Sequence, residues 1–272
     1  MNDVVTYVYA VARNADGLEE LITALNGVAD APVRLVPGSH DNTLVLVASH
    51  VPAQDFQEDA LKQRLEDLDW LEAVARAHHA VIEAVATHTT VLPLRLATVY
   101  LDDTRARDVL DGGQAVFTDR LARLAEHVEW GVKIYVEPSA APAAAEPRRG
   151  AADLSPGRAY LRNRRHQQSV RDSVYQAAQV AADAVEGVGH RHAVDRARHR
   201  VQQGVLADKA GENVVNDAYL VPLAQCEEFR AGVEQAAEGL QGVRIEVTGP
   251  WAPYSFAMPP ADTDDASTGP RP

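Results

Sequence analysis

WLEAVARAHHAVIEAVATHTTVLPLRLATVY, residues 70–100, is the stretch around which the fold is organised. Its first part predicts an amphipathic helix, because apolar side chains recur at steps of three and four residues over 71–85. Pro93 cannot continue a helix, and it favours extended geometry at the residue before it. The segment from Leu94 to Tyr100 is therefore predicted to be a strand that follows a long helix.

One charged residue, Arg95, stands among the apolar residues of that predicted strand. A buried or half-buried arginine needs an acidic partner. Glu72 and Glu83 on the preceding helix are both candidates, and the sequence does not choose between them.

The first half of the chain alternates helices and strands. The run Val4–Val11 is continuously apolar, β-branched or aromatic, which predicts a strand buried on both faces. The order β-α-β-β-α-α-β-α predicts an N-terminal mixed α/β domain over residues 1–126. The strands are expected at 4–11, 33–36, 43–48 and 94–100, and the helices at 18–25, 54–67, 70–86 and 104–126.

The second half has a different pattern, β-α-β-β-α-β, which is typical of a ferredoxin-like domain. It predicts an α+β protein of two domains, the second spanning 127–258 with a Pro/Ala-rich loop at 138–157. Residues 259–272 have no hydrophobic pattern and are expected to be a disordered tail. The strands are expected at 130–136, 198–202, 213–222 and 243–247, and the helices from 154 to about 187 and from 224 to about 239.

Charge and composition exclude several classes of protein. The net charge is −13, and residues 1–137 hold 11 Lys+Arg against 22 Asp+Glu, which argues against nucleic-acid binding. A run of roughly 18 apolar residues is absent, so no membrane span is expected. The start of the sequence lacks a basic segment typical of a signal peptide, which favours the cytoplasm. One cysteine excludes a disulfide framework and a cysteine-based zinc site.

Motifs that carry catalysis or cofactor binding are also absent, including the glycine-rich phosphate loops, the nucleophile elbow and H-E-x-x-H. Cys226 begins a predicted helix beside two glutamates, which favours a packing role over a reactive one. His78 falls on the apolar face of its helix and is expected in the core or at a partner. His190 and His192, with His199, are expected in a solvated Arg-rich loop rather than at a metal. No catalytic, cofactor-binding or metal-binding residue is predicted.

Two segments are candidates for contacts with other molecules. The run Arg158–Arg171 holds five arginines and no acid, so it is either a docking face for an acidic or phosphate-bearing partner or a solvated face pairing with the acidic first half. The run Thr248–Phe256 carries three aromatic residues held extended by two prolines. That run either folds back as a clamp across a domain face or binds another protein.

Taken together, blocks spread over residues 4–256 resemble the gas vesicle protein GvpF/GvpL family. The ordered set carries the resemblance, since no single block is specific. The family commonly has Phe-Gly where Leu96-Ala97 stand, and Pro-Pro where Ala252-Pro253 stand. The blocks are Tyr7–Val11, Trp70 with its helix, Val91–Arg95, Thr98–Tyr100, Glu129–Lys133, Leu154–Leu161, Ala218–Pro222, Thr248–Trp251 and Tyr254–Phe256.

The resemblance implies a non-enzymatic, cytoplasmic or vesicle-associated protein of gas vesicle assembly. Its implied partners are the very hydrophobic major shell protein GvpA and other accessory Gvp proteins. A shell protein with an exposed apolar face needs a partner to cover it before assembly. The expected contact residues are Arg95, Trp130, Trp251 and Tyr254. The alternative is a small-molecule-binding or catalytic protein on a ferredoxin-like scaffold, which would need a pocket with perturbed titratable groups.

Overall fold

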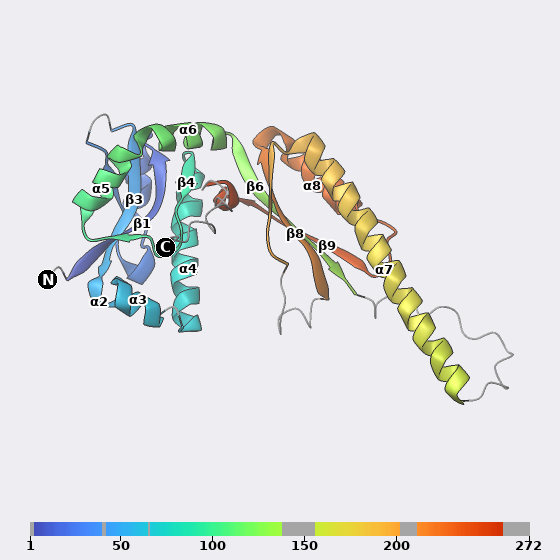
Figure 1. Ribbon diagram of the computed structural model, residues 1–272. Helices are drawn as coiled ribbons and strands as arrows, with labels where there is room; N and C mark the ends of the chain where they lie inside the picture. The colour runs from blue at the N-terminus through green and yellow to red at the C-terminus, as the bar shows by residue number, and fades with distance from the viewer. Residues whose placement is uncertain (1–2, 40–41, 65, 138–155, 202–210, 258–272) are drawn as a thin grey trace, which may run out of the picture. The chain divides into compact units, whose positions relative to one another are not determined.

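The computed structural model describes residues 3–39, 42–64, 66–137, 156–201 and 211–257, without the side chains of 58, 59, 156–159, 161 and 163. Most of the predicted loop at 138–157 and the whole predicted tail at 259–272 therefore lie outside the described residues. The chain divides into two compact units (Figure 1). Unit 1 comprises Met1–Val128 and Trp251–Pro272, and unit 2 comprises Glu129–Pro250.

Unit 1 is built on an antiparallel sheet in the order β2-β3-β1-β4, with β5 also paired to β1. Its strands are β1 (Val4–Arg13), β2 (Arg34–Pro37), β3 (Leu44–Pro52), β4 (Val91–Pro93) and β5 (Val99–Tyr100). Its helices are α1 (Leu18–Thr23), η1 (Val28–Asp30), α2 (Ala53–Phe56), α3 (Glu58–Arg64), α4 (Leu68–Ala86), α5 (Asp103–Gly112), α6 (Gln114–Leu124) and α9 (Tyr254–Ala257).

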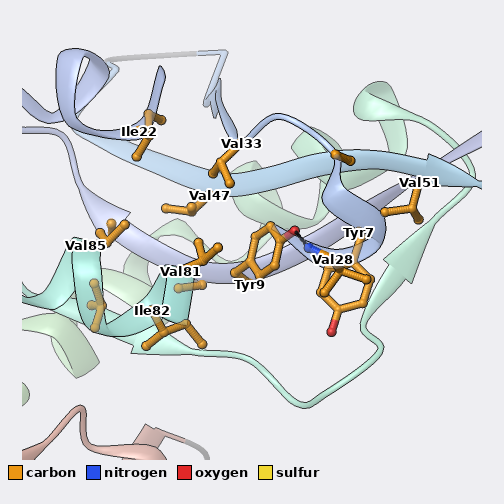
Figure 2. Packing of buried hydrophobic residues seen from close by; sticks show 14 of the residues in the cluster. Tyr7, Tyr9, Ile22, Val28, Val33, Val47, Val51, Val81, Ile82 and Val85 are labelled. Carbon is orange, nitrogen blue, oxygen red and sulfur yellow. Dashed lines mark hydrogen bonds between the residues drawn. The ribbon is translucent and has the colours of Figure 1, made fainter. Parts of the chain in front are cut away.

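Strand β1 is the centre of this unit, and the prediction that both its faces are buried is confirmed. Every side chain from Val5 to Ala12 is buried. Tyr7 and Tyr9 point into the cluster that includes α4 (Figure 2). Thr6 points to the other face, where its hydroxyl donates to Asp103 at the start of α5 at 2.7 Å. Helices thus cover the two faces of the sheet.

Tyr9 fixes the geometry of the core through its hydroxyl as well as its ring. The hydroxyl accepts a hydrogen bond from the Val28 backbone N–H at 2.9 Å (Figure 2). It also donates to Ser49 Oγ at 3.0 Å. A Cβ at Gly27 would stand 2.1 Å from that hydroxyl. Glycine is therefore required at 27 for the loop to close over the tyrosine.

Helix α4 confirms the predicted helix of the organising stretch. Asp67 caps it by accepting from the Trp70 backbone N–H at 3.1 Å. Its buried residues follow the predicted steps of three and four. They are Val74, His78, Val81, Ile82 and Val85.

The predicted continuous strand over 94–100 is wrong. Two short strands, β4 and β5, flank a turn that is closed by Thr98 N–H donating to the Arg95 carbonyl at 3.2 Å. Both strands pair with β1, at Ala10↔Pro93 and Tyr7↔Val99. Only two residues separate Tyr7 from Ala10, whereas five separate Pro93 from Val99, so the longer segment must loop out of the sheet.

Unit 2 has its elements in the predicted order β-α-β-β-α-β, and its sheet has the order β7-β8-β6-β9. The ring of Phe229 packs between Trp130 and Tyr219, at centroid distances of 6.3 and 5.3 Å. The elements are β6 (His127–Val136), α7 (Pro156–His192), β7 (Asp195–Arg198), β8 (Glu212–Pro222), η2 (Leu223–Gln225), α8 (Cys226–Gln235) and β9 (Val243–Trp251).

Several boundaries differ from the prediction. The helix expected over 54–67 is two helices, α2 and α3. The single helix expected over 104–126 is two helices, α5 and α6, because the Gly112–Gly113 pair weakens the helix between them. Helix α7 does not end near Gly187 but continues to His192. Gly189 lies inside the helix. A Cβ at this position would lie 2.4 Å from the Tyr219 ring, so glycine here allows the helix to pack closely on that ring. The strand expected at 198–202 is β7, at Asp195–Arg198.

Candidate interaction surface

The C-terminal segment Trp251–Ala257 folds back onto α4 of unit 1, as the clamp interpretation predicts. The hydroxyl of Tyr254 lies 3.0 Å from Nδ1 of His79, and the Trp251 ring lies 5.4 Å from the His79 ring. The Ala252 backbone N–H donates to Oε1 of Glu83 at 3.0 Å. These contacts hold Trp251, Ala252 and Tyr254 against two successive turns of α4.

A further contact holds the C-terminal end of this segment. Nη1 of Arg120 on α6 donates to the Ala257 carbonyl at 3.0 Å. Ala252 and Ala257 are buried, and Tyr254 is half-buried against the main core cluster. Helix α9 also contacts β4 and α6. The segment is therefore an integral part of unit 1.

Trp251 itself remains 40% exposed, although its neighbour Ala252 is buried. Arg95 and Leu96 are exposed in the turn that directly follows β4, the strand that α9 contacts. An exposed tryptophan and an exposed arginine are residue types enriched at binding hot spots. We refer to Arg95, Leu96 and Trp251 as the aromatic–arginine surface.

The predicted burial of Arg95 is wrong, and so is its predicted acidic partner. Within the described residues Arg95 makes no ion pair. Glu72 pairs with Arg76, one helical turn away. Glu83 accepts from the Ala252 backbone and lies 4.0 Å from His79. Arg95 does not pair with an acidic residue of α4, because it lies in an exposed turn instead of a strand.

Trp130, another expected contact residue, is only 6% exposed. Its ring packs beside Phe229 in the core of unit 2. Of the four expected contact residues, Arg95, Trp251 and Tyr254 lie in unit 1, and Trp130 lies in unit 2. No local pattern separates the buried tryptophan from the exposed one.

His78 has the core position that its place on the helix predicts. Its Nδ1 lies 3.0 Å from the Tyr7 hydroxyl, within hydrogen-bond distance, and that hydroxyl accepts from the Ala97 backbone N–H at 3.0 Å. Burial lowers the pKa of His78 to about 4. Burial also raises the pKa of Tyr7. Both side chains are therefore neutral at neutral pH, and they tie β1, α4 and the turn at Ala97 together.

Sequence reasoning missed an ionic cluster at the start of α5. The Asp103 carboxylate accepts hydrogen bonds from Nη1 of Arg34 at 2.7 Å and from Thr6 at 2.7 Å, and it lies 3.1 Å from His50 Nε2. Burial acts to raise the pKa of Asp103, but these hydrogen bonds outweigh it and hold the pKa well below its usual range. The cluster fastens a helix to three strands that are distant in sequence, so no local pattern reveals it.

A second missed network lies in unit 2. Nη2 of Arg196 donates to Asp217 at 2.6 Å, and its Nη1 lies 3.2 Å from Glu186. A cavity of about 170 Å³ adjoins it, lined in part by His190 and by Tyr219, whose hydroxyl has no partner among the described residues. The guanidinium is already neutralised by two carboxylates. Water fits a cavity of this size that has polar groups in its lining.

The predicted Arg-rich loop holding His190 and His192 is instead the last turn of α7, a correction that follows from the longer helix. Nδ1 of His192 lies 2.8 Å from the Gln225 side chain. No group of three potential metal ligands occurs in the part of the chain that the structure describes. Cys226 is half-buried at the start of α8, with Sγ 3.6 Å from the Pro222 carbonyl.

Comparison with solved structures gives the fold class first. The chain is similar to the crystal structure of gas vesicle protein GvpF from Microcystis aeruginosa, with a TM-score of 0.60, 19% identity, and coverage of 93% of this chain and 99% of that one. The GvpF structure from Anabaena sp. PCC7120 gives a TM-score of 0.61 and 18% identity, covering 95% and 98%. The fold is thus GvpF-like.

Sequence comparison then gives the family. The family model "Gas vesicle synthesis protein GvpL/GvpF" matches residues 5–258. Gas vesicle protein L of Streptomyces sp. (strain CB03234) is 46% identical over 94% of this chain and 93% of its own length. Gas vesicle protein F of the same strain is 26% identical, covering 92% and 98%. The chain belongs to the GvpL/GvpF family of gas vesicle synthesis proteins.

The family supports a gas vesicle role for this chain. No helix among the described residues is both long and apolar enough to cross a membrane.

Proposed function

We propose that this protein is an accessory or minor structural component of the gas vesicle that binds the shell protein GvpA and other Gvp proteins during assembly. The family supports the gas vesicle role, and the aromatic–arginine surface supports the binding role. A shell protein with an exposed apolar face is at risk of aggregation before assembly, and a partner that covers this face removes the risk.

The observation that carries the binding proposal is the exposure of Trp251 within an otherwise anchored segment. Its neighbours are held by Glu83, His79 and Arg120, so the tryptophan is presented in a fixed position rather than on a free tail. Pre-ordered side chains lose less conformational entropy on binding. We assign direct contact with the shell protein to Arg95 and Trp251. Tyr254 holds Trp251 in place, and the buried Trp130 stabilises β6.

The test is co-purification of the full chain with GvpA-type shell protein, using the native protein, Trp251→Ala and Arg95→Ala. Trp251→Ala is expected to reduce captured shell protein about tenfold or more, the loss typical of a hot-spot tryptophan. The matched control is Val116→Ala, which truncates a hydrophobic residue of α6 that is 52% exposed.

Each outcome is decisive for this surface. Unchanged capture by Trp251→Ala and Arg95→Ala, with both variants folded, would place shell binding elsewhere on the molecule. Absence of capture by the native chain, with soluble shell protein present, would contradict the binding role and return attention to the cavity at Arg196.

We further propose a non-enzymatic, cytoplasmic and vesicle-associated protein with a ferredoxin-like second domain. The element order of unit 2 and its strand order β7-β8-β6-β9 support that architecture. The division into domains at 1–126 and 127–258 stays a prediction, and residues 251–257 pack with the first unit.

A further inference from the structure

Helix α7 has two halves with different surroundings. It has 37 residues, Pro156–His192, which corresponds to about 55 Å. Its second half packs on unit 2 through residues that include Val174, Ala178 and Ala181. Between Tyr160 and Ser173, every described side chain is exposed except that of Val170, which is half-buried. Figure 1 shows these first turns extending past the strands of their own sheet.

We call the exposed half, residues 156–171, the α7 arm. It holds five arginines and no acidic residue in a chain of net charge −13. Arg162, Arg164 and Arg165 are exposed and form no ion pair or hydrogen bond with the described part of the chain. Tyr160, 64% exposed, adds a large aromatic surface.

The arm is electrostatically unfavourable when nothing acidic lies against it. Arg162 and Arg165 are three residues apart, so like charges face each other without an acid to pair with. Arg158 stands in the first turn of α7, at the positive end of the helix dipole. An acidic surface laid against the arm would relieve both penalties.

The chain itself carries a surface of matching chemistry at the start of α4. Glu66, Asp67, Leu68 and Asp69 are consecutive and all exposed. Leu68 is 76% exposed, which leaves an apolar side chain among three carboxylates. The arm has the complementary arrangement, a large exposed aromatic among arginines.

We propose that the α7 arm of one copy docks on the acidic segment Glu66–Asp69 of a second copy. The pairing would set arginines against carboxylates and Tyr160 against Leu68, with both apolar groups leaving water. The arm and the acidic segment are different surfaces, so each copy supplies one of each to the contact. This association does not depend on binding of shell protein.

The first measurement is analytical ultracentrifugation of the full chain over a range of concentrations and salt. The weight-average mass is expected to rise above the 29.4 kDa monomer with concentration at about 50 mM NaCl. It is expected to return to the monomer value at about 0.5 M NaCl, where the screening length is a few ångströms. A monomer at every concentration in low salt would overturn the proposal.

Charge exchange gives the sharper test. The arm variant carries Arg162→Glu, Arg164→Glu and Arg165→Glu, and the acid variant carries Glu66→Arg and Asp69→Arg. Asp67 is left unchanged because it caps α4. Each variant alone is expected to stay monomeric, since its own two surfaces now repel. An equimolar mixture is expected to associate, because each variant supplies the complement of the other.

Controls separate this contact from general charge effects. Replacing Arg13, Arg105 and Arg230 with Glu makes the same change in net charge at exposed sites outside both surfaces, and this variant is expected to self-associate like the native chain. Circular dichroism checks that all variants are folded. Tyr160→Ala, which keeps every charge, is expected to weaken association severalfold.

The remaining outcomes contradict the proposal. A mixture of the two charge variants that stays monomeric would exclude the Glu66–Asp69 segment as the occupant. Loss of association in the control variant would show that net charge, and not these two surfaces, controls association. If the arm binds anionic lipid vesicles or RNA and the chain shows no salt-sensitive self-association, the partner of the arm is that lipid or RNA and not a second copy.

Discussion

Single residues in unit 1 have environments that their neighbours in sequence do not reveal. His78 and His79 are adjacent on α4, yet His78 is buried against Tyr7 and His79 is half-buried, with its ring edge to face with that of Trp251. The separation follows from the roughly 100° turn between successive helical residues. The buried His78 affects stability, while the half-buried His79 positions the C-terminal segment.

We expect acid to destabilise the protein through His78. Its pKa is near 6.5 when unfolded and about 4 when folded, so the unfolded state binds more protons between these values. This contribution is complete above about pH 6.5 and is lost as the pH falls to 4, amounting to about 3 kcal/mol at most. Urea unfolding at a series of pH values measures it.

The matched variant for this prediction is His78→Asn, whose side-chain amide can hydrogen-bond the Tyr7 hydroxyl in place of Nδ1. It is expected to be less stable at pH 7 but to show a flatter dependence between pH 6.5 and 4. An equal slope in both proteins would mean that another group is responsible.

We expect Ala97→Gly to stabilise unit 1. Ala97 has a φ of 60°, a left-handed conformation that costs a residue with a Cβ about 1–2 kcal/mol. Glycine removes that strain but increases the entropy of the unfolded chain. The free energy of unfolding is therefore expected to rise by about 0.5–1 kcal/mol. Ala236→Gly, at a φ of −62°, is the control and should destabilise.

At the level of elements, the C-terminal segment and α4 behave as one structure. We expect Tyr254→Phe to lower the free energy of unfolding by about 0.5–1.5 kcal/mol, because it removes the hydrogen bond to His79 without removing the ring. Thermal unfolding measures the change. Tyr175→Phe removes a hydroxyl bonded to Glu212 at an exposed site and is expected to have almost no effect. Equal effects would argue against anchoring by Tyr254.

At the level of the whole molecule, each unit has its own core. Ile82 lies in the core cluster of unit 1, and Phe229 packs with Trp130 and Tyr219 in unit 2. Ile82→Ala and Phe229→Ala are each expected to cost about 2–5 kcal/mol through the cavities they create. In the double variant the two costs should add to within about 0.5 kcal/mol, as denaturant titration can show. Coupling above about 1 kcal/mol would contradict independent cores.

Local pattern predicted much of the fold. The period of apolar residues located α4 and the buried face of its helix, and the uninterrupted apolar run located β1. These predictions are confirmed because the burial of an amphipathic or apolar element depends little on which elements pack against it. The family resemblance, carried by an ordered set of blocks, also followed from the sequence and is confirmed.

The features that only the tertiary structure decided all depend on contacts between distant segments. Arg95 is exposed because β4 and β5 meet β1 at registers that force a loop between them. Trp130 is buried and Trp251 exposed because of what packs on each, not because of their neighbours in sequence. The Asp103 cluster joins residues up to 97 positions apart. Sequence patterns report periodicity within an element, whereas exposure and pairing at a surface depend on which elements meet there.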